Sequence, residues 1–214
     1  RRILHEQFGN GGHGFLTTGR PPNGYGTGNY KVEASGWLPR VMRPWGPYPF
    51  GPGGLTFQST KRARTTITEK ESSGGFDRIG ILYEGQESSQ TTQLKVGAHR
   101  QTINLAPSTG PQVEWVELPE STQKVRLDWK TNRSFVHGLY LQRKGNGYVI
   151  DNFGMVSGQT TELIRFDPTR WGKFIADIEP DLVSFWYGGA GVIRYGGAAT
   201  REKQSWYFRP PPKA

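Results

Sequence analysis

Cysteine is absent from this 214-residue chain, which excludes disulfide frameworks, thiol catalysis and cysteine-based metal sites. No apolar run approaches the roughly 18 residues that a membrane-spanning helix needs, so no membrane span is expected. The four histidines are dispersed along the chain, and their spacing is not typical of a metal site. We therefore expect no metal site. Acidic residues are scarce near the N-terminus, where the first 70 residues contain 10 Lys or Arg against 3 Asp or Glu.

Glycine, proline and aromatic residues are abundant instead. The chain has 30 Gly and 15 Pro, together with 7 Trp, 9 Tyr and 11 Phe. Gly and Pro interrupt helices and mark turns, so this composition favours short strands over long helices. A β-rich globular chain is the class that the composition predicts.

Short strand-like stretches follow one another between residues 55 and 147. Each alternates polar with apolar residues or is wholly apolar, and clusters of Gly, Ser, Pro and Asn separate several of them. Seven or eight such stretches with regular turns are typical of an antiparallel β-sandwich or jelly roll. The predicted strands are Leu55–Thr60, Arg64–Glu69, Arg78–Tyr83, Thr92–Val96, Gln101–Leu105, Val113–Leu118, Lys124–Trp129 and Phe135–Gln142.

The flanking regions follow a different pattern. Residues 1–8 have the apolar spacing of a helix, whereas residues 9–56 are rich in Gly and Pro and predict a packed irregular segment. Further on, a short strand at 148–152 precedes a helix at 168–178, for which Asp167 is a suitable N-cap. A buried strand at 181–187 would complete a βαβ unit. These flanks predict an α/β part, so the expected fold class is mixed α+β.

Three stretches carry a resemblance to a known family, namely Arg1–Phe15, His137–Gly158 and Phe166–Gly191. In order and spacing the sequence resembles the SGNH (GDSL-type) hydrolases, in the subgroup that carries an inserted β-sandwich. The resemblance implies a partial, flavodoxin-like α/β domain from residues 1–54 and 148–214, with a β-sandwich module inserted at 55–147. It also implies an extracellular or periplasmic protein.

The resemblance further implies ester hydrolysis or O-acyl transfer on a carbohydrate, with an acylated glycan as partner and no cofactor. In this family a Ser attacks the acyl carbon, an Asp-His pair supplies the base, and backbone and Asn donors stabilise the oxyanion. The oxyanion-hole Gly falls on Gly158, and the oxyanion Asn falls on Ala190, which has no donor. The sequence contains neither Gly-Asp-Ser nor Asp-x-x-His. We therefore expect an incomplete chain that is inactive alone and belongs to an active parent protein.

A non-catalytic carbohydrate-binding module is the first alternative. Exposed aromatic rings on a sandwich face would stack on the apolar faces of sugar rings, or the same rings would fill the core. Strand alternation places Trp129 on the same face as Val125 and Leu127, which favours the core for that ring. The aromatic candidates for carbohydrate binding are Trp115, Trp129, Tyr83 and Tyr140.

The second alternative is a scaffold domain that binds an anionic polymer through its basic N-terminal third. Its basic residues include Arg40, Arg43 and the run Lys61–Arg64. Nucleic acid is disfavoured as the polymer, because no helix-turn-helix, zinc-finger or RNA-binding-sheet signature accompanies these charges.

Overall fold

A computed structural model describes residues 2–20, 27–41, 48–71, 74–130, 133–145, 147–153 and 167–183. The chain divides into two compact units, residues 1–153 and residues 154–214. We describe each unit by itself.

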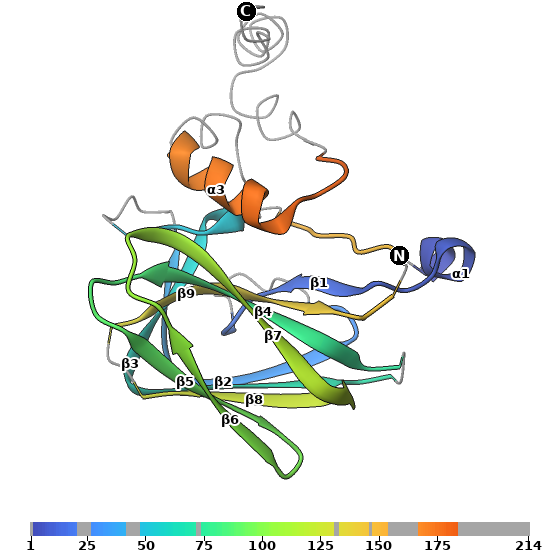
Figure 1. Cartoon of the computed structure of the whole chain (residues 1–214), viewed down its shortest axis with the longest axis horizontal. Coiled ribbons are helices and arrows are strands. Elements are labelled where there is room, and N and C mark those ends of the chain that lie inside the picture. The colour runs from blue at the N-terminus through green and yellow to red at the C-terminus, as the bar shows by residue number, and fades with distance from the viewer. Residues whose placement is uncertain are drawn as a thin grey trace, which may run out of the picture. The chain divides into compact units, whose positions relative to one another are not determined.

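The described residues of the first unit form a nine-stranded antiparallel sheet (Figure 1). The strands pair in the order β6-β5-β8-β3-β9-β4-β7, while β1 pairs with β9 and β2 pairs with β3. A short helix precedes the sheet and a single 3₁₀ turn precedes β3. The elements are α1 (Arg2–Phe8), β1 (Gly12–Leu16), β2 (Tyr30–Val41), the 3₁₀ turn (Pro52–Gly54), β3 (Leu55–Glu69), β4 (Phe76–Gly85), β5 (Gln90–Val96), β6 (His99–Leu105), β7 (Gly110–Thr122), β8 (Lys124–Trp129) and β9 (Phe135–Gln142).

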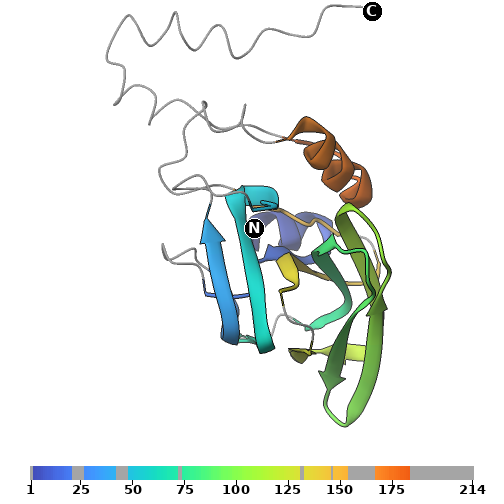
Figure 2. The same ribbon diagram turned by 90° about the vertical axis from the view of Figure 1, so that its left-hand side faces the viewer.

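The expectation of a mixed α+β fold with a flavodoxin-like α/β part is wrong, because antiparallel strands dominate the described residues. Residues 1–54, expected in the α/β part, contribute β1 and β2 to the same sheet as the 55–147 strands. Figure 2 shows β2 (blue) beside the long β3 (cyan). The 12-residue β2 is mostly solvated on both faces, so its sequence lacks the polar-apolar alternation that reveals a half-buried strand.

The pairing of β2 with β3 is also interrupted by a bulge between Ser35 and Trp37, where the single β2 residue Gly36 faces residues 60–63 of β3. Gly36 occupies the bulge with φ +71°, and a β-carbon there would collide with the carbonyl oxygen of Arg62. Glycine is the residue that adopts this left-handed conformation without strain. The bulge lets β2 follow β3 along its whole length while Trp37 reaches the core residue Trp129.

One hydrophobic core lies on the inner face of the curled sheet. It combines side chains from β8, β5 and β6 with side chains from β4, β7 and β9. The burial of β5 alternates strictly along its seven residues, as expected for a strand with one face on the core. By contrast, β9 is buried on both faces over Val136–Leu141. Its outer face is covered in part by the residue that precedes the 3₁₀ turn, since Gly51 lies against His137.

In the second unit the described residues form the helix α3 (Pro168–Ile178), which confirms the helix predicted there. The Asp167 carboxylate accepts a hydrogen bond from the Thr169 amide at 2.9 Å, so Asp167 is the N-cap that the sequence predicts. The strand predicted at 148–152 is reduced to one parallel bridge between Asn10 and Tyr148. Of the strand predicted at 181–187, residues 181–183 are not in a strand, and the others lie outside the described residues.

A substitution at Gly138 tests the pairing of β1 with β9. A β-carbon at this position would collide with the ring of Phe15 and lie 2.8 Å from the Leu16 carbonyl oxygen. We expect Gly138→Ala to lower the free energy of unfolding by about 1–3 kcal/mol, because overpacking forces neighbouring groups to move. Urea denaturation measures the change.

The matched control for this substitution is Gly172→Ala in α3, where a β-carbon meets nothing within 4 Å. Ala is the better helix former, so this variant should be at least as stable as the parent. Equal stability of the Gly138→Ala variant and the parent would contradict the close approach of β1 to β9.

Candidate functional site

The structure buries three of the four aromatic residues proposed to bind carbohydrate. Tyr83, Trp129 and Tyr140 have exposed fractions of 3%, 1% and 0%. Tyr83 and Trp129 belong to the hydrophobic core, and Trp129 packs edge-on against Trp37 with the ring centroids 5.0 Å apart. A ring with no exposed face does not stack on a sugar, so these three residues fill the interior. The oxyanion candidates Gly158 and Ala190 lie outside the described residues.

Trp115 is the one of these four side chains that is only half-buried. It lies on the outer face of β7 opposite Gly80 of β4, where a β-carbon on Gly80 would come within 2.7 Å of the indole ring. The absence of a side chain at Gly80 therefore gives the indole room against the sheet. The Tyr140 ring lies 5.8 Å from the indole, and the Arg78 guanidinium carbon is 4.1 Å from its centroid.

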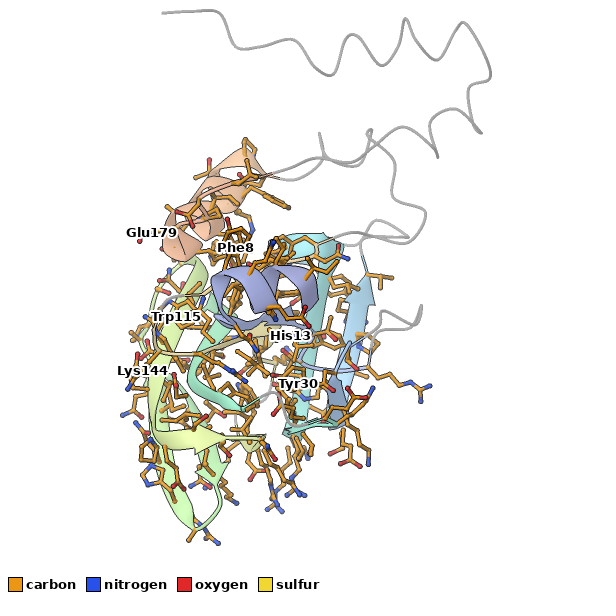
Figure 3. All side chains as sticks on the ribbon, turned by 90° about the vertical axis from the view of Figure 1, so that its right-hand side faces the viewer. Phe8, His13, Tyr30, Trp115, Lys144 and Glu179 are labelled. Atoms are coloured by element: carbon orange, nitrogen blue, oxygen red, sulfur yellow. The ribbon has the colours of Figure 1, made fainter. Side chains whose placement is uncertain are left out.

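Polar side chains surround this indole. Glu117 forms ion pairs with Arg78 at 3.1 Å and with Lys144 at 3.2 Å. Figure 3 shows Trp115 and Lys144 on the same side of the first unit. The Arg78 guanidinium lies over the indole ring, so a sugar would contact the rest of the exposed indole with its apolar ring face, while its hydroxyls would meet the guanidinium, ammonium and carboxylate groups. We call Trp115, Arg78, Glu117 and Lys144 the Trp115 site.

Tyr140 and Asp151 form a polar contact beneath this surface. One Asp151 carboxylate oxygen accepts a hydrogen bond from the Phe15 amide at 2.7 Å. Burial, followed by the negative charge of Asp151, raises the pKa of the Tyr140 phenol well above its usual range. Tyr140 is therefore neutral at all physiological pH values. Phe15 packs on Tyr140 and on Phe153, which holds residues 151–153 against the outer face of β9.

His137 and Glu84 form a second buried polar pair on this side of the sheet. The His137 Nε2 lies 3.3 Å from the Glu84 Oε2, and the His137 side chain has no exposed surface. A carboxylate that orients a histidine is half of a serine-hydrolase triad. Here the imidazole is buried under Gly51, so the pair joins β4 to β9 and has no access to a substrate. These residues are 53 positions apart and no local motif links them, so the sequence pattern does not reveal the pair.

A network of charges centred on Asp128 lies on the outer face of β8. Its carboxylate contacts Arg64 at 2.7 Å, Lys95 at 2.9 Å and Arg126 at 3.0 Å. Partial burial by itself raises the pKa of Asp128, but the hydrogen bonds from the three cations outweigh it and hold the pKa well below its usual range. Asp128 therefore stays ionised down to strongly acidic pH.

Two kinds of site are missing from the part of the chain that the structure describes. No three His, Asp or Glu side chains come together there as a set that could hold a metal ion. None of the described helices is long and apolar enough to cross a membrane.

Comparisons with known proteins identify a fold but no family. No protein-family model matches the sequence, and no curated protein matches it. Among solved structures, a peptidoglycan O-acetylesterase superposes with a TM-score of 0.77 at 17% identity, over 96% of this chain and 55% of that chain. This chain thus spans about half the length of that neighbour, and a likeness at this identity shows that the two share a fold.

Carbohydrate-binding modules also match, at much lower TM-scores. A family 29 carbohydrate binding module gives a TM-score of 0.39 at 10% identity, over 68% of this chain and 88% of that chain. TmCBM61, solved with β-1,4-galactotriose, gives 0.36 at 11% identity, over 55% of this chain and 90% of that chain. Likenesses this distant carry no argument about function.

Asp128 makes the stability of the sheet depend on pH. Because its pKa in the folded protein is below the ordinary value of 3.8, the ionised carboxylate stabilises the fold above that value and loses this effect as the pH falls further. We expect Asp128→Asn to lower the free energy of unfolding by about 1 kcal/mol at pH 7. The difference from the parent should shrink steadily below about pH 4.

Urea denaturation of both proteins between pH 2 and pH 7 measures this difference. Asp181→Asn makes the same charge change at an exposed position of the second unit and should be neutral throughout. If the stability lost in Asp128→Asn stayed constant down to pH 2, the charge of the carboxylate would not be what stabilises the sheet.

Proposed function

We propose that this chain is part of a carbohydrate-active O-acyl ester hydrolase or O-acyltransferase of the SGNH type, in which the β-rich first unit contacts the glycan. The observation that carries the proposal is the match to a peptidoglycan O-acetylesterase over 96% of this chain with a TM-score of 0.77. The order of the three SGNH-like stretches supports it from the sequence. An extracellular or periplasmic location is part of the same proposal, because glycan polymers of the cell wall lie there.

The chemistry proposed for the whole protein is acyl transfer through a serine. The serine hydroxyl attacks the acyl carbon while a histidine takes its proton, and the resulting oxyanion is stabilised by backbone donors. The sugar alcohol then leaves with the proton, and water or another sugar hydroxyl takes the acyl group. In this scheme the Gly158 backbone amide donates to the oxyanion, Ala190 offers no donor, and the serine and histidine come from segments that this sequence does not contain.

Acetate release by the complete gene product tests the proposal. We expect it to hydrolyse 4-nitrophenyl acetate and to release acetate from O-acetylated peptidoglycan, and we expect Ala190→Asn to raise kcat about tenfold or more by restoring one oxyanion donor. Ala176→Asn on the exposed side of α3 adds the same side chain away from the site and should leave kcat unchanged. A folded complete protein with no activity in either assay, as parent or as Ala190→Asn, would contradict the ester chemistry.

A non-catalytic carbohydrate-binding module is the second candidate, and the Trp115 site is the observation that favours it. The site consists of the half-buried indole with Arg78, Glu117 and Lys144 on the same side. Such a site could bind a sugar in a protein that has no catalytic serine.

Trp115→Ala tests sugar binding at this site. We expect it to weaken binding of soluble peptidoglycan fragments to the chain by about tenfold, equal to 1.4 kcal/mol, because the stacking plane is lost. Trp115→Phe should retain most of the affinity. Tyr148→Ala removes another aromatic ring, which is 49% exposed and packs against Phe8 with the ring centroids 5.3 Å apart, and should change nothing in isothermal titration calorimetry. Equal affinities of the Trp115→Ala variant and the parent would contradict a glycan contact at Trp115.

A further inference from the structure

The outer face of β2, β3, β8, β5 and β6 forms a continuous grid of polar side chains. Residues directly opposite one another in an antiparallel ladder lie on the same face. Because Ala63, Leu127 and Leu94 point into the core, their sequence neighbours point outward. One row across the five strands is Ser35, Arg64, Asp128, Gln93 and Thr102, the next is Glu33, Thr66, Arg126, Lys95 and Arg100, and Lys31, Thr68 and Lys124 begin a third.

We call these three rows the basic face. It contains six cationic side chains and two carboxylates. Lys31 and Glu33 neutralise each other in an exposed ion pair at 2.8 Å, which leaves Asp128 as the only carboxylate among these rows to balance the other five cations. The basic face therefore has a net positive charge that its own residues do not compensate.

The Asp128 network shows how this face treats a carboxylate. Arg64, Lys95 and Arg126 converge on a single carboxyl group from three strands. Their three positive charges exceed the single negative charge of the carboxylate that they contact, and the Arg64 side chain remains 51% exposed. Guanidinium groups form strong, directional hydrogen bonds with carboxylates, so a second carboxylate from outside would find donors already held in place.

We propose that the basic face binds an acidic polysaccharide, a glycan that carries carboxylates along its chain. Hydroxyl and carboxamide side chains stand among the cations, namely Thr66, Thr68, Gln93 and Thr102, and these groups match sugar hydroxyls. The three rows contain no aromatic ring, whereas single-stranded nucleic acid is bound by sheets that stack its bases on aromatic side chains. The charge and the polar groups together favour a polysaccharide over a nucleic acid.

On the basic face, the polyanion would bind largely outside the N-terminal third of the chain. Of the basic residues that the sequence singles out, Arg64 lies on the basic face, whereas Arg40 donates a hydrogen bond to Gln58 at 2.8 Å and Arg43 lies outside the described residues. Four of the six cations come from β8, β5 and β6, beyond the N-terminal third. The proposal does not rest on ester chemistry or on the Trp115 site, so each stands or fails separately.

Binding of the full chain to polygalacturonate tests the proposal, with neutral galactan and single-stranded DNA as comparison ligands. We expect polygalacturonate to bind, with an affinity that falls about tenfold or more between 50 and 200 mM salt, and galactan to bind at least tenfold more weakly at this face. Arg100→Gln combined with Lys124→Gln should weaken polygalacturonate binding fivefold or more. These two cations are outside the Asp128 network, so their loss should leave the fold intact.

Two further variants make the result unambiguous. Asp128→Asn removes the central carboxylate and should strengthen polygalacturonate binding several-fold, a gain that unfolding cannot produce. Arg20→Gln combined with Arg133→Gln makes the same charge change as the double variant but outside the three rows, and should leave affinity unchanged. The proposal is overturned if polygalacturonate does not bind, if both double variants weaken it equally, if Asp128→Asn does not strengthen it, or if single-stranded DNA binds as tightly.

Discussion

The pairing of β9 is the constraint on which the rest of the first unit depends. This strand hydrogen-bonds with β4 along one edge and with β1 and β3 along the other, so it joins the two halves of the sheet. Its inner side chains enter the core and its outer side chains are also covered. A strand buried on both faces has its register strongly specified, since a slip of one residue would exchange every side chain between the two faces.

The two polar pairs on the outer face of β9 follow from this double burial. A buried polar group is costly unless it has a partner, and Glu84 and Asp151 lie beside His137 and Tyr140. These pairs hold β4 and residues 151–153 against β9. Groups that resemble catalytic machinery in type thus serve the fold here, whereas the Trp115 site and the basic face present their side chains to solvent.

The sequence predicted the strands that bury at least one apolar face, including β9, whose bounds Phe135–Gln142 it gives although both faces of that strand are buried. Strict alternation marked β5 and β8, and the Asp167 cap with the apolar spacing after it marked α3. The sequence pattern did not reveal β1, which is five residues long and rich in glycine. It also did not reveal β2, which is an edge strand with solvent on both sides and a bulge at Gly36. The βαβ unit predicted from residues 148–187 fails at its first strand, because residues 148–152 form only one bridge, at Tyr148. Of its second strand, residues 181–183 are not extended in a strand and residues 184–187 lie outside the described residues.

The candidate sites were predictable only in part. Alternation placed Trp129 in the core, but it did not separate Trp115, which lies half-exposed over Gly80, from the fully buried Tyr140 across the same face. The Asp128 network joins residues up to 64 positions apart, and such contacts arise from strand order, which the sequence pattern does not reveal. The charge balance predicted an excess of cations, but it did not predict on which face of the sheet these cations lie.

Native-state hydrogen exchange on the full chain tests most directly the claim that residues 1–153 form a single sheet around β9. The account predicts that the hydrogen-bonded amides of β1, and those β2 amides that point toward β3, exchange as slowly as the amides of β9, because all open in the same cooperative transition. Rapid exchange throughout β1 and β2, with slow exchange confined to residues 55–147, would contradict it. That result would mean that the 55–147 strands fold as a separate module.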